Sequence, residues 1–136
     1  MNRMLPTVCA LVITVGMNAQ GAPLEDQAKF VKAILASTGQ FGFACADPGL
    51  KAKLEALGVS VGPGFKLAWG ASEAEVRALK AQGRFVICPE QAWLQSGACL
   101  ALVEEGGRPQ LYVDPANVKA SGMALPEAIA RIVKKG

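Results

Sequence analysis

The sequence predicts a single α/β domain, a compact sandwich in which helices flank a mixed sheet with parallel strands early and an antiparallel hairpin late. The chain has 136 residues, 51% hydrophobic and 18% charged, which suits one domain with a packed core. Helical and strand patterns alternate through its first half, as in parallel sheets whose strands are joined by helices. Residues 99–103 and 110–113 predict two strands around Gly106-Gly107, because glycines accept the positive φ angles of a hairpin turn.

Residues 1–22 have the three parts of a secretory signal peptide. Arg3 precedes an apolar run over residues 5–17, and small or polar residues follow it. The run is shorter than the ~20 residues of a membrane-spanning helix, which favours a cleaved leader over an uncleaved anchor. We therefore expect export to the periplasm and a mature domain over residues 23–136. Cleavage is expected after one of three small residues: Ala19, Gly21 or Ala22.

Two helices and a strand are predicted in the first part of the domain. Residues 24–36 place apolar side chains on one face at helical spacing, and a Ser-Thr-Gly cluster follows them. Residues 41–46, Phe-Gly-Phe-Ala-Cys-Ala, predict a short buried strand. Asp47 is expected to cap the second helix and Pro48 to occupy its first position, and Gly58 is expected to end it.

The middle of the chain predicts a strand, a helix and another strand. Residues 65–69 alternate, so that Trp69 points into the core. Ser72 is expected to begin the helix, because Glu75 follows at the capping-box spacing. Residues 85–88 are uniformly apolar or sulfur-containing and predict a buried strand.

Two further helical segments are predicted after the hairpin. A short one is expected to begin at Asp114-Pro115, and a last helix at Pro126. The final helix is expected to place Lys134-Lys135 at its C-terminus, where positive charge is favourable. Its inward-facing residues are expected to be Ile129, Ile132 and Val133.

The composition disfavours catalysis. The chain contains no histidine, which excludes Ser-His-Asp and Cys-His mechanisms and histidine-ligated metals. It has neither a Cys-x-x-Cys motif nor a glycine loop with phosphate-binding spacing. The net charge is only +3 and the basic residues are scattered, so nucleic-acid binding is not favoured. We expect no catalytic residue, no metal and no cofactor.

Three cysteines remain in the predicted mature domain, and an oxidising compartment favours their pairing. A Cys88–Cys99 disulfide is preferred, because neighbouring strands would hold both ends of the loop between them. A Cys45–Cys88 disulfide is the alternative, and a third possibility is that all three are small buried thiols. An odd thiol also permits a covalent homodimer.

Trp93 is the candidate partner-binding residue. Residues 90–97 are predicted to be a loop with one helical turn that carries this tryptophan. A large aromatic in such a loop need not be buried, and tryptophans are enriched among binding hot spots. The alternative is that Trp93 packs beneath its own loop.

A pattern over residues 84–122 points to a family. Its parts are Gly97-Ala98, residues 102–108 (Leu-Val-Glu-Glu-Gly-Gly-Arg), Val113-Asp114 and residues 119–123 (Lys-Ala-Ser-Gly-Met). Together they resemble the C-terminal part of YfiR-like periplasmic proteins. The resemblance implies a repressor that binds the periplasmic sensor region of an inner-membrane diguanylate cyclase, with disulfides tuning that control of cyclic-di-GMP. Cys99 resembles the family's cysteine on the strand after the small-Gly-small turn.

Two other functions stay open. A small ligand would bind at the ends of the early parallel strands, near Cys45 and Asp47, because ligands of open α/β sheets bind outside the carboxyl ends of strands. A thiol enzyme would use the odd cysteine, but the sequence offers it no histidine base.

Overall fold

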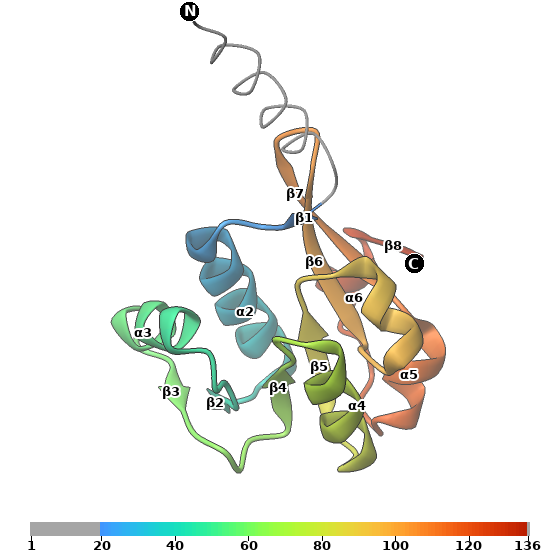
Figure 1. The fold of residues 1–136 in the computed structure, drawn as a ribbon, viewed down its shortest axis with the longest axis horizontal. Coiled ribbons are helices and arrows are strands. Elements are labelled where there is room, and N and C mark those ends of the chain that lie inside the picture. Colours follow the sequence, from blue (N-terminus) through green and yellow to red (C-terminus); the bar gives the residue numbers. More distant parts are fainter. Residues whose placement is uncertain (1–19, 136) are drawn as a thin grey trace, which may run out of the picture.

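The computed structural model describes residues 20–135, which form a mixed β-sheet with helices on both faces (Figure 1). The main sheet has the strand order β4-β5-β6-β7-β8. Its strands are β4 (Leu67–Trp69), β5 (Phe85–Cys88), β6 (Leu100–Glu105), β7 (Arg108–Val113) and β8 (Val133–Lys135). β4, β5 and β6 run parallel, β7 runs antiparallel to β6, and β8 runs parallel to β7. The predicted α/β class, with early parallel strands and a late antiparallel hairpin, is confirmed.

A smaller parallel pair extends the sheet beyond β4. It consists of β2 (Gly42–Phe43) and β3 (Ser60–Val61). Two backbone hydrogen bonds connect the pair to β4: Ala44 N donates to Leu67 O at 2.9 Å, and Trp69 N donates to Ala44 O at 2.8 Å. The parallel strands β3, β2, β4, β5 and β6 therefore lie side by side, with hydrogen bonds that connect the small sheet to the main one.

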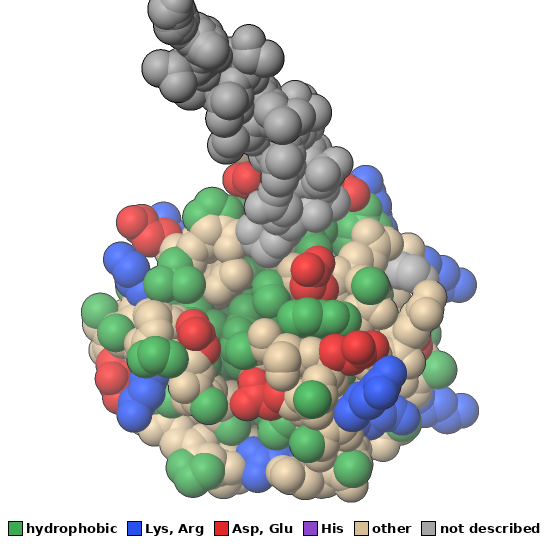
Figure 2. All heavy atoms as spheres, viewed as in Figure 1, with side chains coloured by type: hydrophobic (Ala, Val, Ile, Leu, Met, Phe, Trp, Pro, Cys, Tyr) green, Lys and Arg blue, Asp and Glu red, His purple; other side chains and the backbone are tan. Residues whose placement is uncertain are grey.

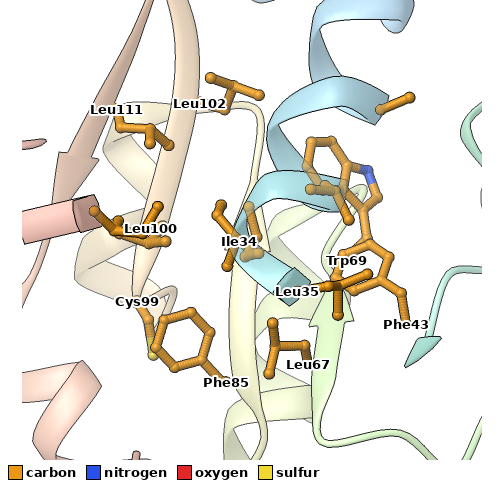
Figure 3. Packing of buried hydrophobic residues seen from close by; sticks show 14 of the residues in the cluster. Ile34, Leu35, Phe43, Leu67, Trp69, Phe85, Cys99, Leu100, Leu102 and Leu111 are labelled. Carbon is orange, nitrogen blue, oxygen red and sulfur yellow. The ribbon is translucent and has the colours of Figure 1, made fainter. Parts of the chain in front are cut away.

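The helices divide between the two faces of the sheet. One face carries α2 (Leu24–Thr38), α3 (Pro48–Ala56), α5 (Pro115–Ala120) and α6 (Glu127–Ala130), and the other carries α4 (Glu73–Ala81) and the 3-10 helix η1 (Gln91–Ser96). Figure 3 shows Ile34 and Leu35 of α2 facing strand residues such as Leu67, and Trp69 lies in the same layer at 3% exposure. The expected core position of Trp69 is confirmed. None of the helices within residues 20–135 is long and apolar enough to cross a membrane.

Alternation along β5 decides which layer each side chain joins. Phe85 and Ile87 pack in the layer beneath α2, whereas Val86 and Cys88 pack in the layer beneath α4. All four are fully buried. A strand that is apolar on both faces is typical of the centre of a parallel sheet.

The predicted helix caps are confirmed. Asp47 Oδ2 accepts a hydrogen bond from Leu50 N at 3.0 Å, and Pro48 begins α3. Ser72 Oγ accepts from Glu75 N at 3.2 Å, and the Glu75 carboxylate in turn accepts from Ala71 N at 2.7 Å. Each bond satisfies a backbone donor that the first turn of a helix leaves free.

The predicted last helix is wrong beyond Ala130. Val133–Lys135 form strand β8, which pairs with the outer edge of β7, and Ile132 is 50% exposed instead of inward-facing. The edge of β7 offers backbone partners that a short terminal helix does not, and lysines are common on edge strands.

The predicted strand over residues 41–46 is shorter than expected. It begins at Gly42, and Phe41 is 90% exposed. The backbone of Gly42 lies against the ring of Phe65, where a Cβ atom would collide with it.

A short N-terminal strand pairs with the part of β6 that β5 leaves free. β1 (Gln20–Gly21) pairs antiparallel with Val103 and Glu104, beyond the two residues of β6 that β5 covers. Ala22 follows at 4% exposure, and its carbonyl accepts a buried hydrogen bond from Gln27 Nε2 at 2.8 Å. Residues 1–19, which hold most of the expected signal peptide, lie outside the described residues.

These contacts favour one of the three expected cleavage sites. Cleavage after Ala19 keeps β1 and Ala22, whereas cleavage after Ala22 removes the pairing with β6 and a buried residue. We expect mass spectrometry of the exported protein to find Gln20 at the N-terminus. A chain that begins at Pro23 should melt at a lower temperature, and a natural N-terminus at Ala22 or Pro23 would contradict this prediction.

Candidate binding site

Trp93 lies in η1, which connects β5 to β6 over the α4 face of the sheet. The predicted helical turn in this loop is confirmed. The indole is half-buried and packs against a cluster that includes Leu94 and Val103. Trp93 therefore has a packed side and a solvent-facing side, and its role as a partner contact stays a prediction.

Two neighbouring elements hold η1 in place. Asn117 of α5 donates from Nδ2 to Leu94 O at 2.7 Å and to Ala98 O at 2.9 Å. From α4, Glu73 accepts a hydrogen bond from Ser96 Oγ at 2.6 Å. These bonds hold the C-terminal half of η1, which follows directly after Trp93.

Sequence reasoning missed Asn117. It is the third residue after Asp114, whose carboxylate caps α5 by accepting from Asn117 N at 3.1 Å. That local pattern signals only a helix start. The role of its side chain depends on partners in η1 that are distant in the sequence.

The predicted Cys88–Cys99 disulfide is not formed, and Cys45, Cys88 and Cys99 all carry free thiols. Cys88 packs in the layer beneath α4, whereas Cys99 packs in the layer beneath α2. Cys88 ends β5 and Cys99 lies directly before the adjacent strand β6, but their side chains enter opposite faces of the sheet. Adjacency alone therefore does not bring the sulfur atoms together.

All three thiols are poor nucleophiles at neutral pH. Burial raises the pKa of Cys88 to about 12, although a backbone hydrogen bond at Glu90 opposes the rise. Burial likewise raises the pKa of Cys45 and of Cys99 to about 11. Because the thiolate is the reactive form, these environments suit packing better than catalysis.

A groove of about 470 Å³ lies between α4 and the β2–β3 pair. Cys45, at the carboxyl end of β2, lines it together with Trp69, Glu75 and Arg84. Asp47 contributes its carboxylate to the cap of α3 instead. The structure thus brings one of the two residues named for the small-ligand alternative to a groove, and that alternative stays a prediction.

Among residues 20–135, no group of three or more Cys, Asp or Glu side chains is arranged to hold a metal ion. Figure 2 shows one face of the molecule, on which Lys and Arg side chains are spread out with acidic side chains between them. On that face no basic patch of the kind that binds nucleic acid is formed.

The fold and this site define a small α/β domain with surface grooves and protonated buried thiols. Neither a family model nor a curated protein matches the chain. A solved structure named "conserved domain protein", from Vibrio cholerae O1 biovar El Tor strain N16961, is similar with a TM-score of 0.62 and 13% sequence identity. The match covers 84% of this chain and 60% of that one, so this chain spans less than two thirds of its length. At this identity the likeness shows the fold alone.

We expect Asn117→Ala to lower the free energy of unfolding by about 1–3 kcal/mol, because it removes the hydrogen bonds from Asn117 Nδ2 to Leu94 O and to Ala98 O. Gln95→Ala, on the exposed side of η1, is the matched control and should change stability little. Urea denaturation followed by tryptophan fluorescence measures both variants. Equal stabilities of the two variants would show that Asn117 does not hold η1.

We expect the free energy of unfolding to fall as pH rises from about 9 toward about 12. In this range unfolded thiols, with an ordinary pKa of 9.0, ionise while the buried thiols keep their protons, so rising pH favours the unfolded state. Cys88→Ala removes the thiol with the most strongly raised pKa and should make this fall less steep. Urea denaturation at a series of pH values compares the slopes, and parallel slopes would contradict the assignment.

Proposed function

We propose that this chain is a non-enzymatic periplasmic binding regulator that resembles YfiR-like repressors of an inner-membrane diguanylate cyclase. The observation that carries the proposal is that residues 84–122, which bear the resemblance, fold as one continuous unit. That unit runs β5–η1–β6–β7–α5 and supplies the central strands of the sheet. The residues that carry the resemblance therefore belong to neighbouring elements of one part of the fold.

The chemistry of the site supports binding over catalysis. Burial holds the three thiols in their protonated form, and the chain has no histidine to act as a base. Export, which we propose from the pattern of residues 1–22, would bring the domain to the compartment where a membrane sensor exposes its periplasmic region.

We propose the solvent-facing side of Trp93 as the contact with this partner. Asn117 donates to Leu94 O and Glu73 accepts from Ser96 Oγ, so the residues that follow Trp93 in η1 are already held and would lose little conformational freedom on binding. Phe41, at 90% exposure, is a second apolar side chain that a partner would cover. Sequence reasoning placed Phe41 in a buried strand and so missed it.

The proposal is tested in a strain that lacks the protein and carries a cyclic-di-GMP reporter. Deletion should raise cyclic-di-GMP, and the wild-type gene should restore the low level. Trp93→Ala should fail to restore it, because loss of a tryptophan hot spot weakens binding roughly 30-fold or more. Trp93→Phe tests whether an aromatic ring suffices, and Lys32→Ala, on the exposed side of α2, is the control that should restore repression.

Unchanged cyclic-di-GMP in the deletion strain would contradict the proposal. Capture of membrane proteins on the mature domain, with and without reductant, identifies the partner by mass spectrometry. Recovery of a membrane cyclase or related sensor would support the proposal. Recovery of no specific membrane protein would favour the alternative, a small ligand in the groove beside Cys45.

A further inference from the structure

A second groove, of about 560 Å³, lies where α5, α6 and β8 meet. We call it the C-terminal groove. Every side chain that lines it is apolar except for two lysines. Its principal lining residues are Val118, Lys119, Met123, Leu125, Val133 and Lys135.

The floor of the C-terminal groove is continuous with the core. Val118 is 7% exposed and packs among the buried residues beneath α2 and α5. Met123, Leu125 and Val133 are half-buried and pack against the same cluster. These side chains leave apolar surface in water, and an aliphatic ligand in the groove would remove it from water.

The charges at the groove have one sign. Lys119 of α5 and Lys135 of β8 line it, and no Asp or Glu does. Within the described residues neither lysine forms an ion pair, whereas the adjacent Lys134 pairs with Glu105 at 3.9 Å. The groove therefore combines an apolar channel with two ammonium groups that have no anionic partner there.

We propose that the C-terminal groove binds a single-chain anionic amphiphile, such as a fatty acid, with its aliphatic chain over Val118 and Leu125 and its carboxylate between Lys119 and Lys135. The volume lies in the range of about 300–1,000 Å³ that is usual for small-molecule sites. A concave site of this size also accepts a separated chain better than the flat surface of a bilayer.

Isothermal titration calorimetry of the mature protein with dodecanoate, kept below its micelle concentration, tests this proposal. We expect saturable binding at one site per chain, and much weaker binding of uncharged dodecanol. The double variant Lys119→Ala/Lys135→Ala should weaken dodecanoate binding roughly tenfold, because two exposed charge contacts are lost. Lys32→Ala is the matched control and should leave the affinity unchanged.

A second variant separates the apolar channel from the charges. Ala130 is exposed on α6 and lines the groove, so Ala130→Trp should fill the channel and abolish binding without disturbing the core. Trp93→Ala should bind dodecanoate as the wild type does, so failure of the regulator proposal would not affect this result. Melting curves check that each variant is folded.

Three outcomes would overturn the proposal. The first is the absence of saturable dodecanoate binding to the folded protein. The second is unchanged affinity in both the double-lysine variant and Ala130→Trp. The third is binding only to anionic phospholipid vesicles or only to an acidic amphipathic peptide, which would assign the groove to a membrane surface or to a protein partner.

Discussion

The structure depends on strand β6, whose backbone must be paired along both edges because its side chains are buried on both faces. Leu100, Ala101 and Leu102 have no exposed surface, and Val103 has 1%. A buried N–H or C=O group without a partner is costly, so each must find one. β7 pairs with one edge from Leu100 to Glu105, and β5 and then β1 share the other. The hairpin, the parallel strands and the N-terminal segment are therefore tied to one strand.

The same burial on both faces sets the chemistry of the cysteines. Side chains alternate along a strand, so a shift of one residue in register moves each of them to the opposite layer. Cys88 and Cys99 occupy different layers, so a disulfide between these two would require β5 or β6 to leave its register. Cys45 is half-buried, so it is the thiol that an oxidant or a second chain reaches with the least disturbance. Redox control of this domain would then act through Cys45 or through opening of the sheet.

Local signals in the sequence predicted most of the secondary structure and the fold class. The caps at Asp47 and Ser72 and the Gly106-Gly107 turn depend on residues a few positions apart, and all three are present. Residues 133–135 fit a helix or a strand equally well, and the free edge of β7 decided between them. Phe41 was misplaced because its apolar neighbours fit a strand, whereas the strand begins one residue later, at Gly42, and leaves Phe41 exposed.

The candidate site was less predictable than the fold. The position of Trp93 in a helical turn follows from the local sequence. The hydrogen bonds from Asn117 to Leu94 O and Ala98 O do not, because they join residues far apart in the sequence. The C-terminal groove exists because β8 pairs with β7 and brings Lys135 toward Lys119 of α5. No local sequence pattern predicts that β8 pairs with β7, so the groove that this pairing forms could not be predicted from the sequence.

Helix α5 connects the two surfaces for which we propose partners. Asn117 faces η1 and holds its carbonyls, whereas Val118 and Lys119 line the C-terminal groove. The helix is short, and side chains form hydrogen bonds at both of its ends. Asp114 caps the N-terminus, and Ser121 Oγ at the C-terminus accepts a hydrogen bond from Met123 N at 3.2 Å. A displacement of α5 by a ligand in the groove would therefore reach the η1 backbone directly. If the ligand changed the affinity of the Trp93 surface for a partner, the partner would change the affinity of the groove by the same factor, because linkage is reciprocal.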